Sequence, residues 1–349
     1  MDYLKFFIAI SLVLWGAGSA YGQPLSECPI STIKQMYAQG HQKEAMDAAR
    51  TLLKNATKAG DLELRIAALE ILFYQPSTRL KTLNTALKDK EKRFRSAALN
   101  FASTDADKSL YTELFKMLPK AKTDVKVDIL LWIGNEAACP EKKAVLKTIE
   151  TGIEKTGTQT LIELLNDPDL EVKQAAIRAL GAIGDKQALP AIAGLLKSDD
   201  ARLLSSVYET IDAYPEDVCY ALARAVSLSS DEGKKIILEL LSRRKANTYF
   251  TLVLEQTKSS NPEVRNKAYE TLKDVVSEKD FVVLCGMLEI SDPAYVEYLQ
   301  QAIVSVLSQL SPEKRLEAIE NRILQAGDAK RYLYEPVLDF YKSPEKMIK

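Results

Sequence analysis

The feature of this chain that most constrains its fold is a repeat of about 31 residues. Apolar residues recur at positions i, i+4 and i+8, which lie on nearly the same side of an α-helix. Eight such triplets follow one another, one of them weakened by a glycine: Leu64/Ala68/Leu72, Phe94/Ala98/Ala102, Val125/Ile129/Ile133, Val172/Ala176/Leu180, Leu203/Val207/Ile211, Gly233/Ile237/Leu241, Val264/Ala268/Leu272 and Tyr295/Leu299/Ile303. Successive triplets begin 30, 31, 47, 31, 30, 31 and 31 residues apart. A unit of this length cannot bury its apolar stripe alone, so the period predicts a stacked solenoid.

The residues before the triplets are typical of helix starts. Three starts place an Asx residue before a proline: Asp167-Pro168, Asn261-Pro262 and Asp292-Pro293. The Asx oxygen accepts a bond from an orphan backbone N–H, and proline loses nothing at the first helical position. Asp199-Asp200 and Ser230-Asp231 can cap without proline. We therefore interpret these acidic residues as helix caps and not as metal ligands or general acids.

Each first helix is followed by a turn and a second apolar helix. The clearest second helices are expected at residues 187–196, 216–228, 247–258, 279–289 and 312–326. Gly181 and Gly184 suit the tight end of a first helix, where a left-handed residue is needed. With almost no strand pattern in the chain, the sequence predicts an all-α protein built as a row of antiparallel helix pairs.

One of these helix pairs resembles a HEAT repeat, in particular the short bacterial HEAT-like type first named from phycobilisome lyases. The matching residues are Glu171-Val172-Lys173, Ala175-Ala176, Ala179-Leu180-Gly181 and Ile183-Gly184, and Pro262-Glu263-Val264-Arg265 repeats the opening. The resemblance covers about residues 61–326, strongly in one repeat and more loosely in the others. It implies an α-α superhelix, a right-handed solenoid whose second helices line a concave face that holds protein partners. It does not imply a reaction.

One interval breaks the period, because it is 47 residues long where the others are 30 or 31. The excess lies between about residues 134 and 157. Residues 141–154 look helical, so we expect an extra helix there, with the true second helix following at 159–165. Such an insertion is either a contact site on a loop side of the solenoid or a local variant that fills its own groove.

The two ends of the repeat array call for caps, because an end repeat exposes an apolar face. Residues 30–59 form an expected helical hairpin that turns at Gly40-His41. The segment 330–341 contains Tyr332, Tyr334, Phe340 and Tyr341, which either cap the last repeat or dock a partner. We therefore divide the chain into a signal peptide (1–22), an N-terminal cap (23–60), about eight repeats (61–326) and a C-terminal cap (327–349).

Residues 1–22 are typical of an export signal. Phe6 to Trp15 form an apolar run of ten residues, too short to span a bilayer, and Ala20-Tyr21-Gly22 predicts cleavage before Gln23. The alternatives are a retained anchor or a lipoprotein, although Glu27 does not suit the site before a lipidated Cys28. We expect a periplasmic or secreted bacterial protein with no membrane insertion after cleavage.

Charge and cysteine content exclude several classes of function. The 47 basic and 48 acidic residues nearly cancel, so no overall field favours nucleic acid. The four cysteines form no CxxC pair, which disfavours zinc. We expect Cys219 and Cys285 to be buried thiols, while Cys139 reaches Cys28 only if the N-terminal helices fold back. Export permits such a disulfide.

The sequence offers no catalytic constellation. His41 is the one histidine, which excludes histidine triads and multi-histidine metal sites. We therefore expect no catalytic residue, cofactor or metal, and predict an exported scaffold that binds a protein partner through its concave face. Tyr220, Arg224 and Tyr249 lie on second helices and are the candidate partner-binding residues. The alternatives are a helical accessory subunit of a secreted carbohydrate-processing assembly and, from the resemblance, a bilin-lyase-like enzyme.

Overall fold

The computed structural model describes residues 28–103, 108–152, 155–215 and 217–342. The expected signal peptide lies outside these residues, as does the end of the C-terminal cap after residue 342. The described residues contain no helix with the length and apolar character needed to span a membrane. The chain divides into unit 1 (Met1–Thr160) and unit 2 (Leu161–Lys349), with the division inside α10 (Gly157–Leu164).

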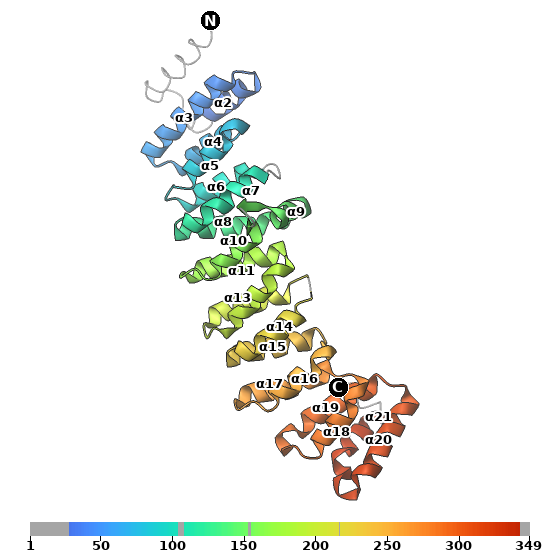
Figure 1. Cartoon of the computed structure of the whole chain (residues 1–349). Helices are drawn as coiled ribbons and strands as arrows, with labels where there is room; N and C mark the ends of the chain where they lie inside the picture. Colours follow the sequence, from blue (N-terminus) through green and yellow to red (C-terminus); the bar gives the residue numbers. More distant parts are fainter. Residues whose placement is uncertain (1–27, 104–107, 153–154, 216, 343–349) are drawn as a thin grey trace, which may run out of the picture. The chain divides into compact units, whose positions relative to one another are not determined.

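Every first helix begins where the period places it, two residues before the start of its apolar triplet. These helices are α4 (Leu62–Leu72), α6 (Lys92–Ala102), α8 (Thr123–Glu136), α11 (Leu170–Ile183), α13 (Ala201–Asp212), α15 (Asp231–Arg243), α17 (Pro262–Val275) and η8 with α19 (Pro293–Tyr295, Val296–Ser308). All triplet residues are buried except Leu64 and Tyr295, which are half-buried. Neighbouring first helices pack together within each unit, as α15 does on α17 and α17 on α19 (Figure 1).

The second helices are shorter, and most of them adjoin a 3-10 turn. They are α5 (Arg79–Ala86), α7 (Lys108–Met117), α10, α12 (Leu189–Ala193), α14 (Cys219–Ala225), α16 (Phe250–Gln256) and α18 (Phe281–Leu288). The adjoining turns are η1 (Pro76–Thr78), η2 (Leu118–Lys120), η3 (Lys186–Ala188), η4 (Gly194–Lys197), η5 (Val226–Leu228), η6 (Asn247–Tyr249) and η7 (Glu278–Asp280). The predicted all-α fold of stacked helix pairs is confirmed.

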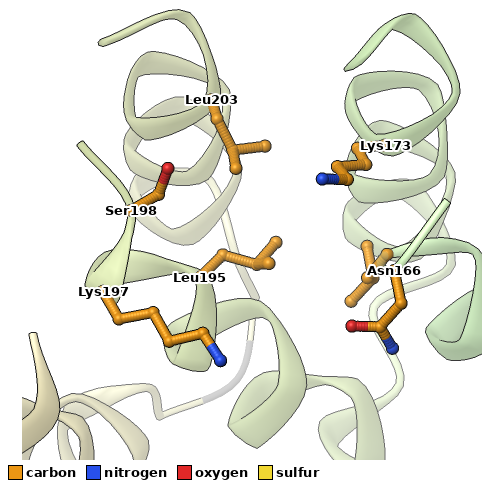
Figure 2. A pocket seen from close by; sticks show the side chains of 7 residues that line it. Asn166, Lys173, Leu195, Lys197, Ser198 and Leu203 are labelled. Carbon is orange, nitrogen blue, oxygen red and sulfur yellow. The ribbon is translucent and has the colours of Figure 1, made fainter. Parts of the chain in front are cut away.

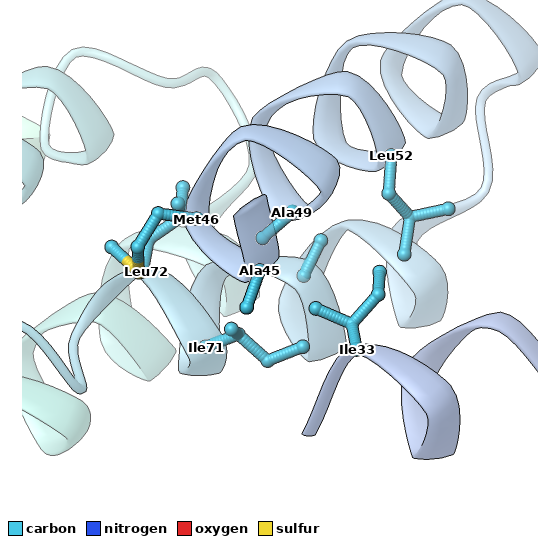
Figure 3. Close-up of a cluster of buried hydrophobic side chains, with 8 residues drawn as sticks. Ile33, Ala45, Met46, Ala49, Leu52, Ile71 and Leu72 are labelled. Atoms are coloured by element: carbon cyan, nitrogen blue, oxygen red, sulfur yellow. The ribbon is translucent and has the colours of Figure 1, made fainter. Parts of the chain in front are cut away.

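The N-terminal hairpin consists of α2 (Cys28–Ala38) and α3 (Gln42–Ala59). It turns at Gly40, whose φ of 93° lies in the left-handed region that favours glycine. Figure 3 shows how the hairpin packs on α4 through a cluster of buried residues: Ile33, Ala45, Met46, Ala49, Leu52, Ile71 and Leu72. The hairpin thus covers the apolar side of the first repeat, while the domain boundaries drawn from the sequence remain predictions.

The long interval contains a helix and a hairpin where the sequence predicted one helix over residues 141–154. Helix α9 (Pro140–Thr148) ends early, and β1 (Glu150–Gly152) pairs antiparallel with β2 (Lys155–Thr156). The β-branched residues Thr148, Ile149 and Thr151 followed by Gly152 favour this extended course. Leu146 and Ile149 are fully buried and β1 packs on α7, so the inner side of the insertion fills a groove of unit 1.

The helix caps agree with the sequence at four starts and differ at one. Asp200, Ser230, Asn261 and Asp292 each accept hydrogen bonds from backbone N–H groups of their own helix. At α11, however, the cap is Asp169, which accepts from Glu171 and Val172, and the expected cap Asp167 accepts from the N–H of Asp169. The helix begins too late for the Asp167 side chain to reach its first N–H groups.

The two glycines near the end of α11 serve different purposes. Gly184 ends the helix with a φ of 62°, as predicted. Gly181 lies inside the helix instead, where an added Cβ would be 2.5 Å from Cγ2 of Thr210 on α13. Close helix packing, and not a left-handed turn, therefore explains Gly181.

The C-terminal segment is held to the last repeats by one partly buried carboxylate. It contains α20 (Pro312–Ala326), η9 (Asp328–Leu333) and α21 (Glu335–Lys342). Glu289, which follows α18, is ion-paired with Arg322 and with Lys330 at 3.3 Å, and it accepts a 2.7 Å bond from the hydroxyl of Tyr334. Burial opposes ionisation of Glu289, but the bonds from Tyr334, Arg322 and Lys330 together lower its pKa.

The four aromatic residues of this segment divide into two pairs. Tyr334 is fully buried, and Tyr341 donates a 2.6 Å bond to the carbonyl oxygen of Val304, so both cap the stack. Tyr332 and Phe340 are exposed.

The glycines give a matched test of how tightly the repeats stack. An added Cβ on Gly233 would lie 1.9 Å from the carbonyl oxygen of Leu196, whereas one on Gly286 meets nothing within 4 Å. We expect Gly233→Ala to lower the free energy of unfolding by about 1–3 kcal/mol or more. Gly286→Ala should raise it by about 0.5–1 kcal/mol, because alanine is the better helix former. Urea denaturation followed by circular dichroism measures both, and equal effects of the two changes would contradict the packing described.

The lowered pKa of Glu289 predicts a pH dependence. A carboxylate whose pKa is depressed by folding stabilises the folded state above its unfolded pKa, and this is lost as pH falls through the folded value. We expect Glu289→Gln to cost about 1–3 kcal/mol at neutral pH, through the lost charged hydrogen bonds. The difference from the unmodified chain should shrink as pH falls below about 4.5, the usual glutamate value. Urea midpoints at a series of pH values measure it, and a constant difference would refute the assignment.

Candidate partner-binding face

Large apolar side chains are exposed in only one part of the described chain. They are Tyr220, Leu228, Val282, Val283, Ile290, Leu316, Leu324, Tyr332 and Phe340. Among the described residues before Tyr220, no large apolar side chain is exposed in this way. Contiguous exposed apolar surface marks interaction sites in proteins. The first five of these residues lie on or directly after second helices of unit 2, and we call their surface, together with Arg224 and Tyr249, the second-helix face.

The first part of the second-helix face is on α14. Tyr220 is 64% exposed, and Arg224 lies one helical turn later on the same side. An Nη1 of Arg224 donates to the hydroxyl of Tyr220 at 3.3 Å, and the guanidinium carbon lies 5.9 Å from the ring centroid. That hydrogen bond raises the pKa of Arg224, which therefore stays charged. The two side chains form a paired aromatic and cationic surface.

The second part lies one repeat further along. Tyr249 ends η6 and is half-buried. Burial raises the pKa of Tyr249, and the nearby groups of Asp217, Cys219 and Tyr220 add to the effect. Of the three residues chosen from the sequence, Tyr220 and Arg224 are therefore in contact on α14, and Tyr249 lies in the turn before the next second helix, α16.

The third part is an apolar surface on α18. Val282 is 68% exposed, Val283 44% and Ile290 83%. Val283 and Ile290 also border a groove of about 420 Å³, whose other lining residues include Leu254, Met287, Tyr269 and Tyr295. Tyr269 and Tyr295 stack with ring centroids 4.0 Å apart, and Arg265 donates a 2.8 Å bond to the hydroxyl of Tyr295. The groove thus has a rigid aromatic side and an exposed aliphatic rim.

A second groove lies earlier in unit 2, and its rim has no exposed large apolar side chain. Its volume is about 470 Å³, and Leu203, which begins a triplet as Tyr295 does, lines it. Figure 2 shows Asn166 and Lys173 on one side of this groove, and Leu195, Lys197 and Ser198 with Leu203 on the other. Polar residues line both grooves, since Thr257, Lys258, Ser291 and Asp292 also border the one near α18. Of the two, the groove near α18 has exposed aliphatic side chains at its rim.

Val282 and Val283 of α18 were not chosen from the sequence, although one sequence pattern indicates that they are exposed. Phe281-Val282-Val283-Leu284 is a run of four apolar residues. Successive residues of a helix are turned by about 100°, so four in a row cannot all face one core. Val282 and Val283 are the two that the stack leaves uncovered.

The residues considered for chemistry are dispersed. Within the described residues, no group of three His, Cys, Asp or Glu side chains could hold a metal ion. Cys219 and Cys285 are buried free thiols, as expected, and burial raises the pKa of each to about 11. Cys139 has a free thiol that donates to Glu141 at 2.9 Å. The side chain of Cys28 lies outside the described residues, so its pairing with Cys139 remains a prediction.

The helix pairs and the uncovered apolar side of the second helices define an α-helical repeat protein. The family model for HEAT repeats matches residues 127–212 and 158–233. HEAT repeats are therefore recognised over residues 127–233, and the resemblance seen in the sequence is confirmed there.

Solved structures give weaker likenesses. One engineered protein of the Northeast Structural Genomics Consortium is 17% identical, with 91% of this chain and 92% of that chain covered and a TM-score of 0.44. A second engineered protein from the same consortium is 20% identical, with 66% and 96% covered and a TM-score of 0.31. The fold assignment does not depend on them. No curated protein matches the chain.

Proposed function

We propose that this chain is an exported, non-catalytic HEAT-repeat scaffold that binds a protein partner through the second-helix face of unit 2. The observation that carries the proposal is that α14, η5 and α18 of unit 2 each expose large apolar side chains. The HEAT resemblance supports the proposal, because it implies that the second helices line a concave side that holds proteins. The apolar run at residues 6–15 supports export.

The energetics of the second-helix face suit a protein partner. Burying a valine or isoleucine side chain fully contributes about 1.5–3 kcal/mol. Val282 and Ile290 are mostly exposed in this chain, so nearly all of that gain is available on association. Tyrosine and arginine are the residue types that most often dominate binding energy, which suits Tyr220 and Arg224. The face offers broad contact without an enclosed cavity, which favours binding over catalysis.

The proposal predicts which substitutions abolish partner capture. The mature chain serves as bait in a crosslinking pull-down from the envelope fraction, compared with Tyr220→Ala/Arg224→Ala and with Val282→Ser/Ile290→Ser. We expect one partner to bind the unmodified chain and to lose at least about tenfold in affinity in each variant, because hot-spot truncations cost about 2 kcal/mol or more. The recovered partner's affinity is then measured with purified proteins.

Leu324→Ser/Tyr332→Ala is the matched control. Leu324 and Tyr332 are also exposed apolar residues, but they lie on α20, the second helix expected over residues 312–326, and on η9, and neither belongs to the second-helix face as defined above. The control should bind as the unmodified chain does. Equal losses in the control and the face variants, or a partner that no face variant weakens, would disprove the proposed role of this face.

A further inference from the structure

Unit 1 carries a lysine-rich edge where second helices end and the next first helices begin. Its members are Lys88, Lys90, Lys92, Lys120 and Lys122, which we call the lysine edge. All five are exposed, and within the described residues none of them forms a side-chain ion pair. The edge therefore carries five lysine charges that are not paired directly with carboxylates.

The lysines have no carboxylate partners because the nearby carboxylates of Asp89 and Asp124 form ion pairs with Arg65 and Arg95, whose side chains are buried. Asp89 lies between Lys88 and Lys90 in the sequence, yet its partner is Arg65, a side chain that is 10% exposed. Asp124 follows Lys122 and lies 3.2 Å from Arg95, whose side chain is only 3% exposed. Arg65 thus neutralises Asp89 from the protein side, whereas Arg95 is shared between Asp124 and Asp128, and none of these carboxylates pairs with a lysine of the edge.

Arg95 also connects the two segments that carry the lysine edge, which are residues 88–92 and residues 120–122. Its Nη1 donates to the carbonyl oxygens of Asp89 and Lys90, both at 3.0 Å. Its Nε donates to Asp128 of α8 at 2.6 Å, and that carboxylate is as deeply buried as Arg95 itself. One guanidinium therefore holds the loop before α6 beside the start of α8. The spacing of the lysines is fixed by a buried ion pair and not by flexible surface contacts.

A positively charged residue stands directly before α8 and adds to the charge of the edge. Lys122 holds the position before this helix, where Asp169, Asp200 and Asn261 stand before α11, α13 and α17. The two units also differ in net charge. Residues 1–160 contain 23 basic and 18 acidic residues, a net +5, and residues 161–349 contain 24 and 30, a net −6. The lysine edge thus lies in the basic half of the chain.

We propose that the lysine edge binds an acidic segment of a protein. Charge complementarity identifies the occupant, and the surroundings favour a protein over a flat polyanionic surface. Glu91 is exposed beside Lys90, and Glu63 lies 2.7 Å from Arg93 at the same edge, so the positive charges alternate with negative ones. A polypeptide can match such a pattern, whereas a uniform layer of phosphates meets repulsion at each carboxylate.

The other exposed side chains of unit 1 also favour an acidic protein segment over a membrane or a nucleic acid. The described residues before Tyr220 contain no large exposed apolar side chain that could enter a membrane or stack on a base. The inference concerns unit 1 alone and holds whether or not the second-helix face of unit 2 binds a partner.

The test uses the purified mature chain and a fluorescein-labelled peptide of alternating glutamate and serine. Fluorescence anisotropy gives its dissociation constant at low and at physiological ionic strength. We expect binding that weakens with salt and that falls about tenfold or more in Lys90→Glu/Lys122→Glu. Lys90→Ala/Lys122→Ala should give a smaller loss in the same direction. These side chains are exposed, and circular dichroism verifies that the variants remain folded.

The matched control is Lys43→Glu/Lys54→Glu. Both lysines are exposed on α3 of the same unit, so the change in net charge is identical but lies away from the edge. The control should stay within about twofold of the unmodified chain. No binding by the unmodified chain, or equal losses in the edge variant and the control, would overturn the proposal. So would tighter, edge-dependent binding to phosphatidylserine vesicles or to oligothymidylate.

Discussion

The burial of one apolar stripe between successive first helices is the interaction on which the rest of this structure depends. Ala98, Ala176 and Ala268 stand at the centre of their triplets with no exposed surface, so neighbouring helices approach closely. The approach is especially close at Gly233, because its α-carbon packs directly against the backbone of Leu196. A repeat that buries its stripe only against its neighbours has no independent core. The stack therefore requires covers at both ends, and the α2–α3 hairpin and Tyr334 cover them.

This arrangement separates the residues that fold the chain from those that remain available for binding. The first helices and the inner sides of the second helices are used in stacking. The outer sides of the second helices contribute little to it, so their side chains are free to vary. Lysines occupy the edge of unit 1, while valine, isoleucine and tyrosine occupy the second helices of unit 2. Folding does not explain the exposure of Val282 or Ile290, whereas the proposed binding of a partner would.

Much of this fold could be predicted from the sequence because helix periodicity is a local property. Each triplet lies on a first helix that begins two residues before it, and the HEAT resemblance was confirmed. The cap of α11 was misplaced because Asp167 and Asp169 both flank Pro168, and only the path of the backbone decides which carboxylate reaches the first N–H groups. The β1–β2 hairpin was missed because a short β-branched run and a helix end look alike.

The candidate site was harder to predict, for a different reason. Periodicity shows which residues are apolar, but it does not show which of them the stack leaves uncovered. Tyr220, Arg224 and Tyr249 were chosen for their place on second helices, and the structure shows a contact between the first two. Val282 and Ile290 were not chosen, because their exposure depends on where neighbouring repeats end. Export and the domain boundaries remain predictions from sequence alone.

The most direct test of the central claim is site-specific photo-crosslinking in living cells. A photoreactive amino acid replaces Tyr220 or Val282 on the second-helix face, or Glu209, an exposed residue on the first helix α13 of the repeat to which α14 belongs. The account predicts one discrete crosslinked partner from positions 220 and 282 and none from position 209. A partner captured only from position 209, or from all three positions equally, would contradict the assignment of binding to the second helices.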